Sequence, residues 1–249
     1  MLEQSNALSD LHGLGVLSDT QFSALHILCR ALHVDGPDLG ATLDAILTSA
    51  TAAISGADHA GVNLVVRGRF EPQATLGSAP EPLDALQHRT GMGPCVDASR
   101  SQVSVDIDDM ASDGRWPDFA AAALSSGVQS MLCVPLWVDE RRLGSLSLYA
   151  ESRAAFDNSA KRLAELYATH AAVALLEAQR ADQLRRALQS RDVIGQAKGV
   201  LMERHRITAD AAFAMLDEVS RTTNRKIADV AEILADTGQL PHTAGAQEA

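Results

Sequence analysis

The chain has 249 residues, of which 46% are hydrophobic and 21% are charged, as in globular proteins rather than disordered or collagen-like ones. Its formal net charge of −11 argues against a protein that coats nucleic acid, but it is compatible with a basic patch on one domain. The chain opens without a secretory signal, and no apolar run approaches the length of a membrane span, about 18 residues. Three cysteines are too few for a disulfide framework. We therefore expect a cytoplasmic protein of one or two domains that does not enter a membrane.

Two helices are predicted before a sheet. Apolar residues recur at helical spacing over 19–34, behind Asp19 as the N-cap, so residues 1–37 are expected to form an N-terminal helical segment. A second helix is expected over 38–54. Strands are then predicted from period-two alternation and apolar runs, with a hairpin formed by the first two, at 61–66, 70–76, 103–107, 131–138 and 143–149. A further helix begins at Pro117 and ends at Gly127.

The strand at 131–138 is apolar on both faces, as is typical of a strand inside a sheet. We predict that Met131, Cys133 and Trp137 project from one face, whereas the other face carries Leu132, Val134, Leu136 and Val138. One face should pack on helices and the other should line a small-molecule pocket. The candidate pocket residues are these first three and Cys95, which follows a Gly-x-Gly-Pro turn.

A long helix is predicted from 157 to about 204, since this stretch has no proline and is rich in helix-forming residues. Leucine and valine recur in it at near-heptad spacing, at Leu163, Leu166, Val173, Leu176, Leu184 and Leu188. Such a seam is compatible with a helix packed on its own sheet or with a helix that pairs with a second copy. We favour pairing, with 157–190 as a connecting and dimerisation helix in a homodimer.

The charge changes near Leu184. Residues 1–184 carry 12 Lys and Arg against 23 Asp and Glu, whereas residues 185–236 carry 9 against 8. Thr208 is predicted to cap one helix and Asn224 to precede another, so residues 185–240 form a three-helix unit, followed by a flexible tail over 241–249. Its core is predicted to contain Ala197, Leu201, Phe213, Leu216 and Ala231.

Polar and basic residues of this unit form a candidate binding face. Gly199 lies in mid-helix, where it costs about 1 kcal/mol relative to alanine, so it indicates close helix packing or ligand access. The other candidate contact residues are Arg191, Gln196, Lys198, Arg204, Ser220, Asn224, Arg225 and Lys226. The competing interpretation is that these charges are merely solvated.

Three motifs of this unit are Arg191-x-Val193-Ile194-x-Gln196-Ala197-Lys198-Gly199-x-Leu201-Met202, Ala212-Phe213-x-x-Leu216 and Ser220-x-x-x-Asn224-x-Lys226-Ile227-x-x-Val230-Ala231. Together they resemble the ANTAR domain of bacterial transcription antiterminators, with a departure at His205-Arg206, where the family more often has a glycine turn. The preceding part resembles a GAF sensor domain, through Gly91-Met92-Gly93-Pro94-Cys95-Val96-Asp97-Ala98, Arg115-Trp116-Pro117 and Gly144-x-Leu146-x-Leu148-Tyr149. The motif associated with cyclic-nucleotide binding is not found.

The resemblance implies an α+β fold, in which a GAF-like antiparallel sheet flanked by helices occupies 38–180 and an all-α ANTAR bundle follows. It also implies an RNA-binding regulator whose dimer binds paired stem-loops in nascent mRNA and prevents formation of a terminator. The GAF domain would be a sensor of an unidentified effector or a scaffold. With Phe213 assigned to the core, hydrogen bonds and arginine stacking are expected to dominate RNA recognition.

Two other functions stay open. A three-helix unit also fits a DNA-binding regulator. Gly199 in mid-helix and the near-zero net charge of this unit nevertheless disfavour a protein that binds the major groove of DNA. A GAF-type methionine sulfoxide reductase would use cysteines but would give the three-helix unit no role. No histidine or cysteine spacing of a metal site and no phosphate-binding loop is present, so we expect no enzyme activity, metal or cofactor.

Overall fold

The computed structural model describes residues 38–241, so the predicted helix at 19–34 and the end of the predicted tail lie outside the described residues. The chain divides into two compact units, Met1–Ala181 and Asp182–Ala249. Helix α6 (Asn158–His205) is continuous and contributes its first part to one unit and its last part to the other. The prediction of a long helix is therefore confirmed.

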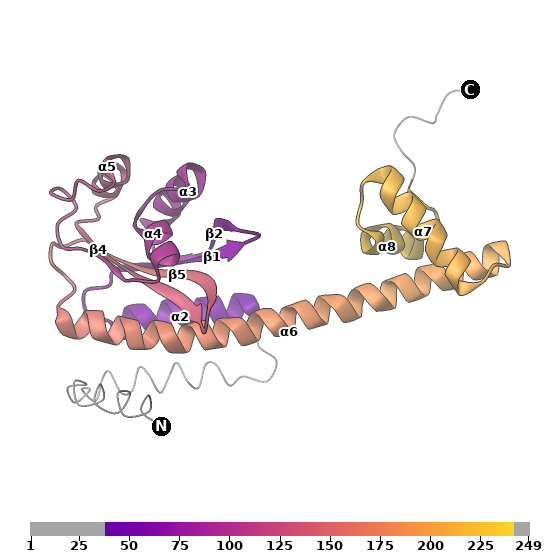
Figure 1. The fold of residues 1–249 in the computed structure, drawn as a ribbon, viewed down its shortest axis with the longest axis horizontal. Helices are drawn as coiled ribbons and strands as arrows, with labels where there is room; N and C mark the ends of the chain where they lie inside the picture. Colours follow the sequence, from indigo (N-terminus) through magenta and orange to yellow (C-terminus); the bar gives the residue numbers. More distant parts are fainter. Residues whose placement is uncertain (1–37, 242–249) are drawn as a thin grey trace. The chain divides into compact units, whose positions relative to one another are not determined.

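The first unit is built on a five-stranded antiparallel sheet in the order β2-β1-β5-β4-β3 (Figure 1). The strands are β1 (His59–Val66), β2 (Arg69–Leu76), β3 (Val105–Ile107), β4 (Ser130–Val138) and β5 (Arg141–Ala150). The predicted hairpin is confirmed, and Arg67 and Gly68 at its turn both have positive φ, which matches the twist of the two strands. The expected α+β class is thus confirmed.

Helices cover both faces of this sheet (Figure 1). Helix α2 (Leu39–Ala53) and the first part of α6 bury apolar residues against one face. The hydroxyl of Tyr167 in α6 donates to the carbonyl of Ile46 in α2 at 2.7 Å, which ties these two helices together. The other face is covered by α3 (Pro80–Thr90), α4 (Pro94–Ser101) and α5 (Pro117–Ser125). Only α5 of these three was predicted.

The predicted leucine seam of α6 is not one surface. Leu163 and Leu176 are buried in the core beneath the sheet, which contradicts a seam that faces a partner along its whole length. Leu184 and Leu188, which follow the first unit, are 63% and 51% exposed. The first unit therefore buries Leu163 and Leu176 but leaves Val173 half exposed, whereas Leu184 and Leu188 remain uncovered by the described part of the chain.

The second unit consists of the end of α6, α7 (Ala209–Thr223) and α8 (Ile227–Thr237). Its core contains Ala197, Leu201, Ala212, Leu216, Val230, Ala231 and Leu234. The backbone N–H of Ala211 donates to the Thr208 hydroxyl at 3.3 Å, which confirms the predicted cap. The placement of Phe213 in this core was wrong, because its side chain is 44% exposed and lies outside the cluster.

Candidate functional site

A shallow groove of about 500 Å³ lies between α6 and α7 of the second unit. Phe213 of α7 lines it together with Arg191 and Lys198 of α6. The other lining residues are Ala187, Ser190, Ile194 and Gly195. The groove therefore combines an exposed aromatic ring with two cations, which is the chemistry that stacks on bases and binds phosphates.

The two glycines of α6 leave its backbone bare beside this groove. A Cβ atom added to Gly195 or to Gly199 would meet no other atom within 4 Å. Packing inside the described chain therefore requires neither glycine, although each costs about 1 kcal/mol in a helix interior. Packing inside the described chain therefore does not explain Gly199, which leaves close approach by a second chain or by a ligand as the reasons that the sequence suggested.

The basic residues of the second unit fall into two groups. Arg185, Arg186, Arg206 and Arg221 each pair with a carboxylate three or four residues away on their own helix or its end. Among the described residues, no carboxylate lies within 4.0 Å of the other five basic side chains, which are Arg191, Lys198, Arg204, Arg225 and Lys226. These five are the basic residues that the sequence motifs singled out as contact residues.

The polar residues of the turn between α7 and α8 also shape the backbone. The Ser220 hydroxyl donates to the carbonyl of Arg225 at 2.6 Å, and the N–H of Arg225 donates to the carbonyl of Ser220 at 3.1 Å. Asn224 ends α7 with a φ of 52°, a left-handed conformation that few residue types other than glycine and asparagine adopt easily. Ser220 and Asn224 therefore have structural roles in addition to any contact, whereas the Arg225 and Lys226 side chains are exposed.

The predicted contact residues do not all lie at the groove. Arg191 and Lys198 line it, and Gln196 and Gly199 are exposed nearby on α6. The guanidinium of Arg204 lies instead near Gly238, which ends α8 in a left-handed conformation. A cation there complements the negative end of the α8 dipole. Sequence reasoning missed Phe213 as a candidate contact residue.

In the first unit, the structure splits the predicted pocket residues between two places. Cys95, Met131 and Cys133 lie in the core cluster beneath α3, α4 and α5. Trp137 was predicted to share their face, and this was wrong: it is 46% exposed and lines a groove of about 300 Å³ with residues of α6. The cause is local, because β3 pairs with β4 only as far as Cys133, and the β4–β5 register shifts between Leu136 and Trp137.

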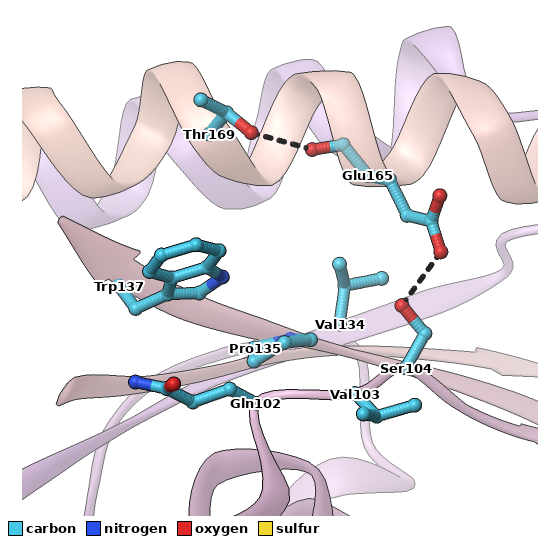
Figure 2. A pocket seen from close by; sticks show the side chains of 8 residues that line it. All are labelled: Gln102, Val103, Ser104, Val134, Pro135, Trp137, Glu165 and Thr169. Atoms are coloured by element: carbon cyan, nitrogen blue, oxygen red, sulfur yellow. Dashed lines mark hydrogen bonds between the residues drawn. The ribbon is translucent and has the colours of Figure 1, made fainter. Parts of the chain in front are cut away.

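Figure 2 shows this groove, in which the indole of Trp137 lies between the edge of β4 and helix α6. Ser104, which precedes β3, donates a hydrogen bond to the Glu165 carboxylate at 2.9 Å across it. Besides Trp137, Ser104 and Glu165, its lining residues are Gln102, Val103, Val134, Pro135 and Thr169. An indole beside a carboxylate can contact an amphipathic group, but nothing in the groove selects a particular ligand.

A buried carboxyl group lies in the interior of the first unit. Asp84 of α3 has no exposed surface and accepts a hydrogen bond from the Tyr149 hydroxyl of β5 at 2.9 Å. Its other oxygen has no partner among the described residues. Burial raises the pKa of Asp84 from 3.8 to about 6, and the Tyr149 hydroxyl and the neighbouring Asn63 side chain offset only part of this rise.

This pKa predicts a specific pH dependence of stability. Because the folded-state pKa of Asp84 lies above the unfolded value, its contribution is fully present below about pH 4 and is lost as the pH rises through about 6. Asp84→Asn keeps an acceptor for Tyr149 but cannot ionise. We expect the fall in the free energy of unfolding between pH 4 and pH 7 to be smaller in this variant by about 2 to 3 kcal/mol.

Tryptophan fluorescence during denaturant unfolding can test this prediction, since Trp116 and Trp137 are the only tryptophans and both belong to the first unit. A Ser104→Ala variant, which changes a hydrogen bond at the surface groove, serves as the control and should keep the pH dependence of the parent chain. An equal fall in the parent chain and in Asp84→Asn would show that Asp84 does not titrate in this range.

No described helix has the length and apolar character to cross a membrane. Over residues 38–241, no group of three or more His, Cys, Asp or Glu is placed to hold a metal ion. The acidic residues in and directly after β3 are paired with cations. Lys161 contacts both Asp106 and Asp108, and Arg153 contacts Asp109.

Both units match known domain families. Residues 37–176 match the GAF domain, and residues 182–234 match the ANTAR domain. A sensor domain followed by this helical domain defines the chain as a regulator. The chain belongs to the GAF domain family and carries an ANTAR domain after it, which confirms the resemblance of the sequence motifs.

Solved structures of GAF domains share the fold of the first unit. The GAF domain of an Acinetobacter phosphoenolpyruvate-protein phosphotransferase is 15% identical, with a TM-score of 0.53 over 67% of this chain and 99% of that chain. A GAF sensor protein from Burkholderia vietnamiensis is 13% identical, with a TM-score of 0.53 and the same coverage of each chain. No relative was found among curated protein sequences.

Proposed function

We propose that the ANTAR unit binds paired stem-loops in nascent mRNA and prevents formation of a terminator, with the GAF unit as sensor or scaffold. The observation that carries this proposal is that some basic side chains of the ANTAR unit form ion pairs within the protein and others do not. Five basic side chains without a carboxylate partner belong to a unit that also exposes an aromatic ring. Cations that are not neutralised within the protein are available to phosphates.

The groove favours unpaired bases over duplex DNA. RNA is read in sequence mainly at loops, where bases leave the stack and contact aromatic or arginine side chains. Phe213 offers such a ring in the groove that Arg191 and Lys198 also line, and the bare backbone at Gly195 and Gly199 lets a ribose or base approach closely. A reader of the major groove would instead present a row of side chains to base edges.

Two stem-loops require two binding faces, which a symmetric homodimer provides. Leu184 and Leu188 lie one turn apart on α6 and remain exposed. A second copy of this part of α6 would bury both leucines, and it would place two ANTAR units on neighbouring helices. The proposed dimerisation segment is therefore shorter than the predicted 157–190.

The decisive experiment sequences the RNA that co-purifies with the full-length protein. Synthetic RNAs with two hairpins from that set are then compared with scrambled strands, single hairpins and duplex DNA of equal length. We expect the two-hairpin RNA to bind most tightly and its affinity to fall as salt rises. Competition in which duplex DNA displaces the two-hairpin RNA would instead support a DNA-binding regulator.

Two substitutions of Asn224 distinguish a contact with RNA from a purely structural role in the turn after α7. Asn224→Ala removes the side chain and strains the left-handed end of α7, whereas Asn224→Gly removes the side chain and keeps this conformation accessible. If the amide contacts RNA, both variants lose affinity, and only Asn224→Ala also loses stability, by about 1 kcal/mol. Fluorescence anisotropy with two-hairpin RNA and thermal unfolding by circular dichroism measure the two effects. Parent-like affinity in Asn224→Gly would limit Asn224 to the turn.

A further inference from the structure

Two cysteines meet in the interior of the GAF unit. Cys95 lies in the first turn of α4 and Cys133 lies in β4, and their sulfur atoms are 3.4 Å apart. Both side chains are fully buried, and both thiols are free. A disulfide bond has a length of about 2.05 Å, so the sulfurs need to approach by only a little more than 1 Å, a movement of about the size of a side-chain adjustment.

The surroundings of the two sulfurs differ. The side-chain amide of Gln87 donates to the sulfur of Cys95 at 2.9 Å, and the Ser147 hydroxyl lies 2.9 Å from the same atom. The Cys133 thiol has a longer contact, to the Ser147 oxygen at 3.8 Å. Burial, and then the neighbouring Cys95, raise the pKa of Cys133 well above its ordinary value. Burial therefore keeps Cys133 a thiol, whereas Cys95 is the sulfur with the closer polar contacts.

We infer that Cys95 and Cys133 form a reversible disulfide when a small hydroperoxide reaches this interior. The sulfur of Cys95 gives up its proton and attacks one peroxide oxygen, the O–O bond breaks, and the hydroxide that leaves takes up this proton as water. The sulfenic acid on Cys95 is then attacked by the sulfur of Cys133, whose proton goes to the departing oxygen, and a second water leaves. Two thiols and one hydrogen peroxide thus give one disulfide and two waters. An external thiol reverses the reaction and is itself oxidised to a disulfide.

The bond would change how the helices above the sheet are held. Gln87 of α3 now contacts Cys95 twice, because its amide oxygen also accepts the N–H of Cys95 at 2.9 Å. A covalent bond to Cys133 would tie α4 directly to β4 and draw the sulfur away from Gln87. The GAF unit would in this way sense an oxidant through its own residues, without a bound effector.

Peptide mapping of the full-length protein tests this inference. Reduced protein is exposed to hydrogen peroxide, alkylated in denaturant and digested with trypsin, which places Cys95 in peptide 90–100, Cys133 in peptide 116–141 and Cys29 in peptide 1–30. We expect a linked pair of peptides 90–100 and 116–141, with a protein mass lower by about 2 Da. The link should vanish after dithiothreitol. Because both sulfurs are buried, it should form over minutes to hours, through local opening.

Two variants sharpen the result. Cys29→Ser should form the same linked peptides as the parent chain, since Cys29 takes no part. Cys133→Ser should form no link and should accumulate overoxidised Cys95, about 32 Da heavier as the sulfinic acid. Should this second variant fail to fold, the parent chain and Cys29→Ser still decide the question. Peroxide treatment that leaves both peptides alkylated, or links either of them only to peptide 1–30 or between chains, overturns the inference.

Discussion

Replacing Phe213 with alanine should weaken binding of two-hairpin RNA by about five- to a hundredfold while the bundle stays folded. The ring is 44% exposed, lies outside the core cluster and lines the groove with Arg191 and Lys198. Stacking of a base on an aromatic side chain contributes about 1 to 3 kcal/mol, and each 1.4 kcal/mol is a factor of ten in affinity. Fluorescence anisotropy at one fixed salt concentration measures the loss, and circular dichroism monitors the helices.

Two further variants distinguish stacking from a general loss of apolar surface. Phe213→Tyr keeps an aromatic ring and should bind RNA within a few-fold of the parent chain. Met202→Ala removes an exposed apolar side chain of α6 that does not line the groove, and it should leave the affinity unchanged. Unchanged binding by Phe213→Ala, or equal losses in Phe213→Ala and Met202→Ala, would remove Phe213 from the proposed RNA site.

The misplacement of Phe213 shows how far helical periodicity extends. Its position on α7 agrees with an apolar face, but Ala212 and Leu216 already fill the contact with the two other helices. In a bundle of three short helices, the buried stripe on each helix is narrow, because neighbours cover only part of its circumference. Periodicity therefore identified the helix correctly and overestimated the width of its buried face.

The two helices that were not predicted, α3 and α4, are short and partly polar on their buried faces. Each begins with proline in its first turn and is only 11 or 8 residues long. Their buried residues include polar ones, such as Asp84 and Gln87, which contact residues far away in sequence. A search for apolar repeats misses such helices, because each is short and polar residues occupy part of its buried face.

The unpaired cations among the candidate contact residues could be predicted from sequence more readily than α3 and α4. Opposite charges three or four residues apart on a helix pair with one another, a rule that accounts for Arg185, Arg186, Arg206 and Arg221. The same rule finds no carboxylate at these spacings from Arg191, Lys198 or Arg204, so spacing alone distinguishes the unpaired cations of α6. The position of Arg204 beside Gly238 depends on how α8 folds back, so it cannot be predicted from spacing along the chain.

Replacing Gly144 with alanine should destabilise the GAF unit by about 3 kcal/mol or more. Gly144 lies in the central strand β5, where it pairs with Leu64 of β1 on one side and Leu136 of β4 on the other. A Cβ atom at this position would overlap the carbonyl oxygen of Asn63, which belongs to the backbone of β1. Because a backbone atom cannot turn away as a flexible side chain can, relief of the clash requires the two strands to separate.

Gly114→Ala is the matched control, because it makes the same chemical change in the same unit at a position where a Cβ atom meets nothing within 4 Å. Its free energy of unfolding should stay within about 0.5 kcal/mol of the parent chain, as expected for a surface substitution. Denaturant unfolding followed by tryptophan fluorescence reports the GAF unit alone, since the ANTAR unit has no tryptophan. If Gly144→Ala instead unfolds at the same denaturant concentration as Gly114→Ala, β1 and β5 tolerate a wider spacing. The close approach of the two strands would then not be the reason for glycine in this motif.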